Sequence, residues 1–401
     1  MKMTDTKKDF QSHFSSPTIP APPLHGQFND SPNLEQKSTK PTGRKKESPS
    51  LSKWFMRLSK KKRIIFVASV TAIIVLLCFL SWWFIFRSTE AEEPAPAAVE
   101  EPAPPPTTEA SKLTGLQVGF DINKRPVTAI MVENSPEARP QSGLSEAGVV
   151  YEAVAEGGIT RFMALFQDNL PAKVGPVRSV RPYYLDYLVP YGAAIAHVGG
   201  SGQALAEIRN EGIRDLDQFS NSGPYWRDSA RYAPHNMYTA VNQLLDLQTQ
   251  KSFGPTDYTS LVRGAEDKPS ETPNARTISI SMSRSLYQAG YTYDPTTNSY
   301  LRTLASQPHI DANTGLQLAP KVVITPIVPR SQSGIYSVYG VNGSGAGLVF
   351  QNGTVSSVTW KKDNRADQIR FFDAEGNPFK LVAGQTWITL AASATDVTYA
   401  P

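Results

Sequence analysis

The sequence predicts an α/β or α+β ectodomain that is followed by a smaller β-rich domain and tethered by a single transmembrane helix. Three observations lead to this fold class. An uncharged, mostly apolar run covers residues 64–86. Strand-like and helix-like apolar patterns alternate over residues 113–260, which is typical of an α/β arrangement. From residue 276 onward, short strand-like runs are separated by Asn-Gly, Asp-Pro and Glu-Gly-Asn turns, which is typical of a β-rich domain.

The charge distribution supports this division of the 401 residues. Residues 1–63 carry 14 Lys and Arg against 5 Asp and Glu, a net charge of +9, whereas residues 87–401 carry 26 against 31, a net charge of −5. The larger part of the chain is therefore mildly acidic, which argues against nucleic-acid binding. The single cysteine, Cys78, excludes an intrachain disulfide.

A membrane anchor is predicted at residues 64–86. A helix of this length spans roughly 34 Å, which is enough to cross a bilayer. Three lysines and an arginine directly precede the run, and only Arg87 follows it before a series of glutamates. The positive-inside rule therefore places the N-terminus in the cytoplasm and everything after residue 87 outside the cell membrane. A cleaved signal peptide is the alternative, but the run is long and no small-residue cleavage site follows it.

The composition of the other segments completes the predicted organisation. Residues 1–63 form a basic cytoplasmic tail whose Pro-, Ser- and Lys-rich composition predicts disorder, with docking of a cytoplasmic partner as the alternative. Residues 87–112 form a Pro/Ala/Glu-rich extracytoplasmic linker with up to roughly 75 Å of reach. The N-terminal α/β domain covers residues 113–260, and the C-terminal β-rich domain covers residues 276–401.

A β-hairpin is predicted around Gly157-Gly158, because strand-like runs flank the two glycines. With a two-residue turn, Glu152, Glu156 and Arg161 share one face of the hairpin. Two carboxylates and a guanidinium would then meet on one surface. The alternative is an ordinary cross-strand salt bridge on a solvated face.

An anion-binding region is predicted just after the hairpin. Arg178 and Arg181 lie directly before Pro182, which suits the first position of a helix. Free backbone N–H groups at a helix start favour anions, and arginines add bidentate donors. The alternative is a pair of surface arginines that bind Asp217 or Glu207.

Further polar residues follow along the same domain. His197 lies near the end of a predicted strand, and Ser201 lies in a glycine-rich turn before a helix, which together make a plausible anion cradle. The turn lacks the spacing of a nucleotide-binding motif, and His197 is equally well explained as a core residue. If the polar residues converge, their ligand is anionic. The candidate ligand-binding residues are Arg139, Arg161, Arg178, Arg181, His197, Ser201, Asp217, Arg227, Arg231, His235 and Asn236.

Several motifs in this order resemble a known family. ENSPEARPQSGLSEA, YEAVAEGGITRF, GPVRSVRPYYLD, HVGGS, DLDQF and WRDSARYAPHNMY are similar to segments of the YerB-like envelope proteins, which carry a two-part domain of unknown function, number 3048. GLVFQNG and GNPFKLVAGQTWI resemble its C-terminal part. The resemblance covers roughly residues 114–397.

This resemblance implies α/β and β-rich parts and a cell-envelope setting, but no established reaction. The chain differs from the lipid-anchored members in its apparently uncleaved apolar helix and its long N-terminal tail. The matching polar positions are Glu133, Asn134, Arg139, Glu152, Glu156, Arg161, Arg178, Arg181, His197, Asp217, Arg227, Arg231, His235 and Asn236.

The leading hypothesis is a binding module: a membrane-tethered ectodomain that grips an anionic cell-wall glycan, a teichoic phosphate or an acidic segment of an envelope protein partner. The alternative is an enzyme that cleaves a wall glycan, with Glu156 or Glu152 as the general acid and a pKa raised by apolar surroundings. In strand geometry the two Cα atoms lie roughly 13 Å apart. Glycosidase carboxylates lie about 5–9.5 Å apart, so a single acid is expected rather than a pair.

No cofactor and no metal are predicted. His197 and His235 with Asp215 or Asp217 offer ligand-type side chains, but their spacing matches no metal-binding motif. Cys78 lies inside the apolar run, so a cysteine nucleophile is excluded outside the membrane. Ser201 lacks the strand–turn–helix context of a nucleophilic serine.

Overall fold

The computed structural model describes residues 51–87, 106–264 and 268–401. The chain divides into two compact units, Met1–Glu101 and Pro102–Pro401. The predicted tail up to residue 50 and the predicted linker between residues 88 and 105 lie outside the described residues.

The first unit contains helix α1, Leu51–Met56, and helix α2, Lys60–Arg87. Helix α2 contains the whole predicted anchor and is long and apolar enough to cross a membrane, by length and composition. None of its residues is buried within the unit. A lipid environment would therefore cover side chains that nothing else in the described part of this unit covers.

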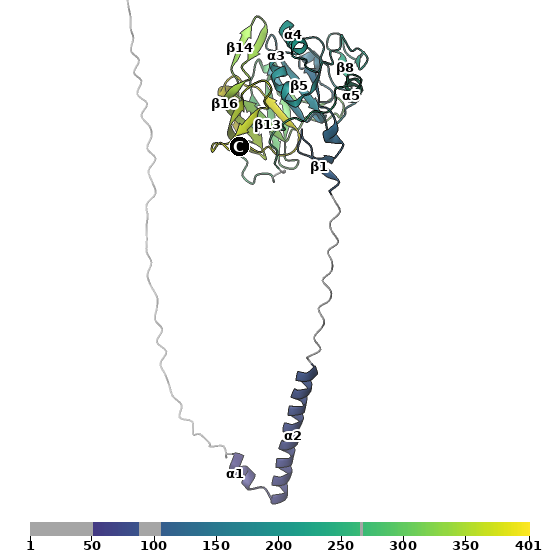
Figure 1. The fold of residues 1–401 in the computed structure, drawn as a ribbon. Coiled ribbons are helices and arrows are strands. Elements are labelled where there is room, and N and C mark those ends of the chain that lie inside the picture. The colour runs from purple at the N-terminus through teal and green to yellow at the C-terminus, as the bar shows by residue number, and fades with distance from the viewer. Residues whose placement is uncertain (1–50, 88–105, 265–267) are drawn as a thin grey trace, which may run out of the picture. The chain divides into compact units, whose positions relative to one another are not determined.

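The second unit is built on a nine-stranded sheet with the order β18-β17-β16-β13-β19-β4-β5-β3-β6 (Figure 1). Its strands are parallel at β13/β19, β19/β4 and β3/β6, and antiparallel elsewhere. In chain order the strands are β3 Thr128–Glu133, β4 Val149–Val154, β5 Thr160–Phe166, β6 Ala194–Ala196, β13 Val322–Pro326, β16 Gly343–Gln351, β17 Thr354–Lys362, β18 Arg370–Phe372 and β19 Thr386–Thr389.

This sheet draws strands from both predicted domains. Strand β19, close to the C-terminus, lies between β13 and β4 and pairs in parallel with each of them. The stretch at residues 251–275, where the sequence predicts a boundary, therefore separates two parts of the chain that share one sheet.

Smaller sheets surround the large one. A five-stranded sheet has the order β12-β11-β10-β9-β20, and β1/β2, β7/β8 and β14/β15 form two-stranded pairs. Strand β1 includes residues of the predicted linker, so the folded unit begins before residue 113. These strands are β1 Thr108–Ala110, β2 Gln117–Gly119, β7 Tyr225–Arg227, β8 Met237–Thr239, β9 Thr277–Ile280, β10 Ala289–Asp294, β11 Ser299–Leu304, β12 Gln307–Pro308, β14 Arg330–Ser333, β15 Tyr336–Tyr339 and β20 Val397–Ala400.

Helices are few in the second unit. The α-helices are α3 Pro182–Leu188, α4 Gly202–Asn210 and α5 Val241–Gln250, within the part that the structure describes. Short 3-10 helices cover Ile122–Lys124, Pro136–Ala138, Leu144–Glu146, Val189–Tyr191, Ser285–Tyr287 and Ala394–Asp396. The fold is thus mostly β-sheet with few helices.

The nine-stranded sheet is buried on both faces at strands β3, β4 and β5. Every residue of β3, β4 and β5 is buried, as expected for strands whose sequence is a nearly continuous apolar run. Tyr151 stacks on Tyr187 of helix α3 on one face, with ring centroids 4.7 Å apart. Phe162 packs against Trp387 on the other face, at 5.3 Å. The polar residues in these strands therefore lie inside the protein and not on a solvated surface.

Candidate functional site

The hairpin predicted at Gly157-Gly158 is present, but its register is one residue away from the predicted one. Ala153 pairs with Arg161, and Val154 with Thr160. The backbone N–H of Ala155 donates to Ile159, so the loop contains three residues, Glu156 to Gly158, instead of two. A shift of one residue reverses which side chains share a face. Glu152 and Arg161 consequently lie on opposite faces, and the prediction that they share one is wrong.

Glu152 lies on the Trp387 face and is fully buried. Its Oε2 accepts hydrogen bonds from Arg302 Nη2 at 2.9 Å, from Trp387 Nε1 at 3.0 Å and from Thr389 Oγ1 at 3.3 Å. Arg302 is also fully buried, so the pair is a closed internal ion pair. Glu152 has no contact with solvent, and its position contradicts the prediction that it acts as a general acid on an external glycan.

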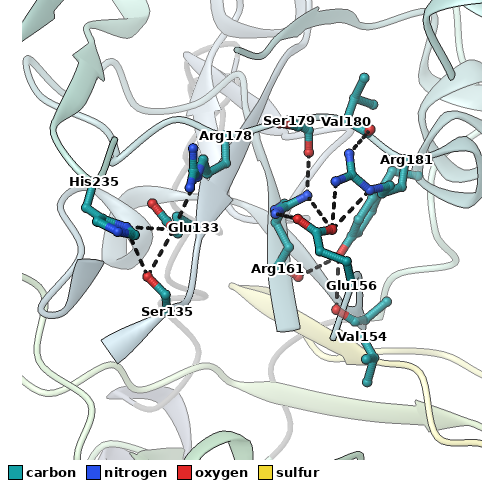
Figure 2. A network of polar contacts seen from close by, with 12 residues as sticks. Glu133, Ser135, Val154, Glu156, Arg161, Arg178, Ser179, Val180, Arg181 and His235 are labelled. Carbon is teal, nitrogen blue, oxygen red and sulfur yellow. Dashed lines mark hydrogen bonds and ion pairs between the residues drawn. The ribbon is translucent and has the colours of Figure 1, made fainter. Parts of the chain in front are cut away.

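Glu156 bridges two arginines on the other face (Figure 2). Its carboxylate accepts from Arg161 Nη2 at 2.7 Å and from Arg181 Nη2 at 2.7 Å and Nε at 3.1 Å. Burial acts to raise the pKa of Glu156, but the two guanidinium groups outweigh it and hold the pKa below its ordinary value. A general acid needs the opposite shift, so the prediction of a raised pKa at Glu156 is wrong.

Glu156, Arg161 and Arg181 form a first cluster. A second cluster lies next to it, around Glu133 at the end of β3. One oxygen, Oε1, lies 2.9 Å from His235 Nδ1, 2.9 Å from Ser135 Oγ and 3.1 Å from Arg178 Nε. An ionised carboxylate only accepts, so the ring of His235 donates from Nδ1 and keeps Nε2 free of this contact. The carboxylate is nearly fully buried, whereas the side chains of Arg178 and His235 are each about a quarter exposed, at 25%.

The segment from Arg178 to Arg181 joins the two clusters. Its first residue donates its backbone N–H to Met131 of β3, and Ser179 accepts from Arg161 Nη1 at 2.9 Å. Glu133 and Arg161 are also direct partners across β3 and β5. Figure 2 shows Arg178 above Glu133 and Arg181 above Glu156 along this one segment. Arg161 and Arg181 thus meet at Glu156, and Arg178 and His235 meet at Glu133, at the two ends of this segment.

The arginines of this region differ in how many of their guanidinium nitrogens donate hydrogen bonds within the protein. Neither Arg178 nor Arg181 binds Asp217 or Glu207, the partners of the alternative prediction. Arg178 pairs with Glu133, and Arg181 pairs with Glu156. Arg181 is buried, and each of its three nitrogens donates within the protein. In the described part of the chain, neither Nη atom of Arg178 donates a hydrogen bond. Arg178 is therefore a partly exposed member of the two clusters whose terminal nitrogens are left for a ligand.

The remaining predicted residues have structural partners. Arg139 donates to Asn134 and to the carbonyl of Leu286. Arg231 donates to the carbonyls of three residues between 137 and 140. Arg227 donates to Asn236, which is buried and donates to the carbonyl of Arg231. Arg227, Arg231 and Asn236 fix the loop that carries His235, whereas Arg139 holds Asn134 and Leu286.

His197 is a satisfied core histidine, one of the two explanations open from the sequence. It is fully buried between Asp215, 3.1 Å from Nε2, and the carbonyl of Gly199, 2.8 Å from Nδ1. Asp217 accepts from the backbone N–H of Gly199. Ser201 is the N-cap of helix α4 and accepts from the backbone N–H of Ala204. In the described residues, no group of three His, Cys, Asp or Glu side chains could hold a metal ion.

A cavity of about 350 Å³ opens beside Arg181. Its walls come from α3, the start of α4, the β14–β15 hairpin and Arg365. Burial raises the pKa of Asp186 in this lining, although the charge of Arg365 acts in the opposite direction. No sequence pattern indicates this cavity, because the hairpin and the helices are more than 100 residues apart in the chain. Its lining includes Arg181, Asp186, Gly202, Glu207, Tyr336 and Arg365.

Glu133 and Ser135 are the members of the second cluster that reasoning from residue spacing missed. Glu133 was indicated only by the family resemblance, although it ends a buried apolar strand. A carboxylate at that position, followed by Asn and Ser, was the available signal: burying a charge costs stability unless it has partners. Its partner His235 lies 102 positions away in the sequence.

Comparison with known proteins gives a consistent result. Family models described as the N-terminal and C-terminal domains of a protein of unknown function, DUF3048, match residues 113–254 and 278–388. A Bacillus subtilis (strain 168) protein named "Putative lipoprotein YerB" is 33% identical over 288 residues, which cover 69% of this chain and 85% of that protein. The crystal structure of YerB from Bacillus subtilis matches with a TM-score of 0.67 at 27% identity and covers 73% of this chain and all of that one. The predicted resemblance is thus confirmed, and the chain belongs to the DUF3048 family of YerB-like proteins.

Proposed function

We propose that this protein is a single-pass, membrane-anchored envelope protein that binds an anionic group of a cell-wall ligand through Arg178. Helix α2 is the anchor, the N-terminus lies in the cytoplasm, and the unit Pro102–Pro401 lies outside the membrane. The ligand is an anionic wall polymer, such as a glycan strand with carboxylates or a teichoic phosphate chain.

Two observations support the location. A relative of this family is named a lipoprotein, which is consistent with a protein held at a membrane surface. In this chain Lys60 to Arg63 lie at the start of α2, and only Arg87 lies at its end. Basic residues are enriched on the cytoplasmic side of membrane helices, so this asymmetry favours a cytoplasmic N-terminus.

The observation that carries the anion-binding proposal is the state of Arg178. Its Nε lies 3.1 Å from the buried Glu133, which holds the guanidinium in place. Figure 2 shows a terminal nitrogen of Arg178 pointing away from the Glu133 carboxylate, and the side chain is a quarter exposed. A guanidinium that is held by an internal carboxylate and is partly exposed is suited to bidentate recognition of a carboxylate or phosphate. His235 lies beside it, with its Nδ1 at 2.9 Å from the same carboxylate oxygen.

The other predicted arginines are less suited to the role. Arg161 and Arg181 share the charge of Glu156, and each is nearly fully buried. Bringing a ligand to them would require breaking an ion pair inside the protein. Of the predicted arginines, Arg178 is therefore the one that we propose as the contact for the ligand.

The test is co-sedimentation of the full chain, in detergent, with purified cell-wall sacculi that retain their anionic polymers. The Arg178→Ala variant should bind about 10-fold more weakly or worse, because a charge-assisted hydrogen bond contributes about 1.5–3 kcal/mol. Arg178→Lys should recover part of the binding, since lysine keeps the charge but not the bidentate geometry. Binding of the wild type should fall as salt is raised.

The matched control is Arg370→Ala. Arg370 lies on β18 at the opposite edge of the sheet, with a half-exposed side chain, so its loss removes the same charge at a different place. Equal binding by Arg178→Ala and the wild type, with unchanged melting temperatures, would reject Arg178 as the site. Failure of the wild type to sediment with sacculi would reject a wall polymer as the ligand.

A further inference from the structure

The cavity beside Arg181 has a lining of a different character from the surface at Arg178, and Arg178 is not part of it. We infer that this cavity is a second binding site, and that it takes an uncharged, hydroxyl-rich ligand, a short segment of an oligosaccharide. The inference does not depend on the anion-binding proposal above.

The charges in the lining are balanced within the protein. Arg365 binds Asp186 through Nε at 3.1 Å, Glu207 through Nη2 at 2.5 Å and Glu211 through Nη1 at 2.5 Å. Arg181 is paired with Glu156 behind the wall. Both cations of the lining are therefore already paired with carboxylates of the protein. Such a lining gives no strong preference for an anion, whereas it offers both donors and acceptors at fixed positions.

Hydroxyl groups match this arrangement, because each one donates and accepts. Carboxylates of Asp186 and Glu207 can accept from ligand hydroxyls while they remain paired to Arg365. On the opposite wall, the hydroxyls of Ser333 and Ser337 line the cavity and make no hydrogen bond to any residue that the structure describes. The cavity therefore presents polar groups of both kinds to the same ligand.

An apolar surface lies among these polar groups. Tyr336 is 39% exposed and Val338 is 45% exposed, although both are large side chains that contribute to the cavity wall. The guanidinium carbon of Arg181 lies 5.1 Å from the ring centroid of Tyr336 and holds the ring in place. A flat apolar surface beside fixed polar groups suits a pyranose ring, which has apolar C–H groups on its faces and hydroxyls at its edge.

The wall that carries Tyr336 is fixed to the body of the protein. The backbone N–H of Gly157 donates to Ile335 at 3.0 Å, and that of Ser337 donates to Ala155 at 2.8 Å. These bonds join the β14–β15 hairpin to the loop that contains Glu156. Glu156 is thus a positioning residue, which holds Arg181 under Tyr336. A preformed wall lowers the entropy cost of binding.

The volume limits the ligand. At about 350 Å³ the cavity lies at the small end of the range for ligand pockets, roughly 300–1,000 Å³. It has room for a short oligosaccharide segment and not for a folded protein domain. A longer glycan would continue past the exposed tip of the hairpin.

The test is binding of the full chain, in a detergent without a sugar headgroup, to an array of uncharged and of uronate- or phosphate-bearing oligosaccharides. At least one uncharged oligosaccharide should bind, and its affinity should be measured by calorimetry. Tyr336→Ala should weaken that binding at least about 10-fold, as is typical for loss of an aromatic anchor.

A second variant places a large side chain in the cavity wall. Gly202 lines the cavity, and a Cβ atom at this position would meet nothing within 4 Å. Gly202→Phe should fill the site and abolish glycan binding. The matched control is Gly254→Phe, because Gly254 has equally open surroundings and does not line the cavity. Arg178→Ala should leave this binding unchanged, which separates the two proposed sites.

Three results would overturn the inference. The array could show no binding of any uncharged oligosaccharide, or binding of charged ones alone. Alternatively, a bound uncharged oligosaccharide could retain its affinity in both Tyr336→Ala and Gly202→Phe while both variants keep the wild-type melting temperature. The sedimentation of Arg178→Ala with sacculi tests the site at Arg178 and does not test the cavity.

Discussion

Glu156 makes its contribution to this protein as an ionised group. It is bound by Arg161 and Arg181, and its pKa is lower in the folded protein than its ordinary value of 4.5. A lowered pKa means that the unfolded chain binds the proton more readily than the folded one. The stabilisation is therefore complete above pH 4.5 and is lost as the pH falls through the folded-state pKa.

This linkage predicts the behaviour of Glu156→Gln. At neutral pH the variant should be less stable by about 1–3 kcal/mol, because two buried arginines lose a charged acceptor. Below pH 4.5 the difference in the free energy of unfolding between the variant and the wild type should become smaller. Urea unfolding at neutral pH and below pH 4.5 measures this difference. Glu375→Gln, at an exposed turn, is the control and should show no such difference. A gap that is independent of pH would contradict the ionised role.

The Glu152–Arg302 pair allows a second prediction on single residues. Both side chains are fully buried, with Arg302 Nη2 at 2.9 Å from the carboxylate. Arg302→Met should cost about 3–5 kcal/mol, because it leaves the buried carboxylate of Glu152 without its counter-ion. The double variant Arg302→Met, Glu152→Leu should regain much of this stability. Urea unfolding measures the free energy of unfolding of the single and the double variant. Equal values for the two would contradict the expected cost of the unpaired carboxylate.

The sequence could not reveal these partners. Glu152 and Arg302 are separated by 150 positions, and no local pattern links them. The sequence did show that charges lay within apolar strands, and that such charges require partners or a function. Arg161 and Glu156 follow from the predicted hairpin, and Arg178 and Arg181 follow from the predicted helix start. The pairing of Glu156 with Arg161 and Arg181, and of Arg178 with Glu133, depends on distances that periodicity does not contain.

At the scale of elements, the hairpin shows where prediction from the sequence ends. Its two strands were predicted, but the face of each side chain was not. Two glycines are compatible with a two-residue turn and with a three-residue loop. The three-residue loop forms here because Glu156 and Gly157 are held by Arg181 and by the β14–β15 hairpin. That hairpin lies far along the chain, so the local sequence did not determine the register.

Helix α4 provides a prediction for an element. Ser201, expected to bind a ligand, is its N-cap and accepts from the backbone N–H of Ala204. Ser201→Ala should lower the free energy of unfolding by about 1 kcal/mol, whereas Ser201→Asp should keep the cap. Thermal unfolding of the two variants measures this. Equal melting temperatures for Ser201→Ala and the wild type would show that the cap contributes little.

At the scale of the whole second unit, the central sheet joins the two sequence regions that the family models describe separately. The match ends at residue 254 for one model and resumes at residue 278 for the other. Yet β19 lies between β13 and β4, and Gln385 just before it donates to the carbonyls of Leu144 and Ala147. Composition and periodicity located the strands but gave no information on which distant strands pair. A boundary in the sequence is therefore compatible with a shared core.

The shared sheet predicts that Pro102–Pro401 unfolds as one cooperative unit. Removing the C-terminal region would expose one edge of β4 and the apolar groups that pack on Trp387, so a chain ending at residue 260 should not fold. In calorimetry of the full unit, the calorimetric and van't Hoff enthalpies should agree. Trp387→Ala, which removes a fully buried side chain, should lower the melting temperature of that single transition rather than split it. Two separable transitions, or a stable fragment 113–260 after proteolysis between residues 251 and 275, would mean that the two regions fold independently in spite of the sheet they share.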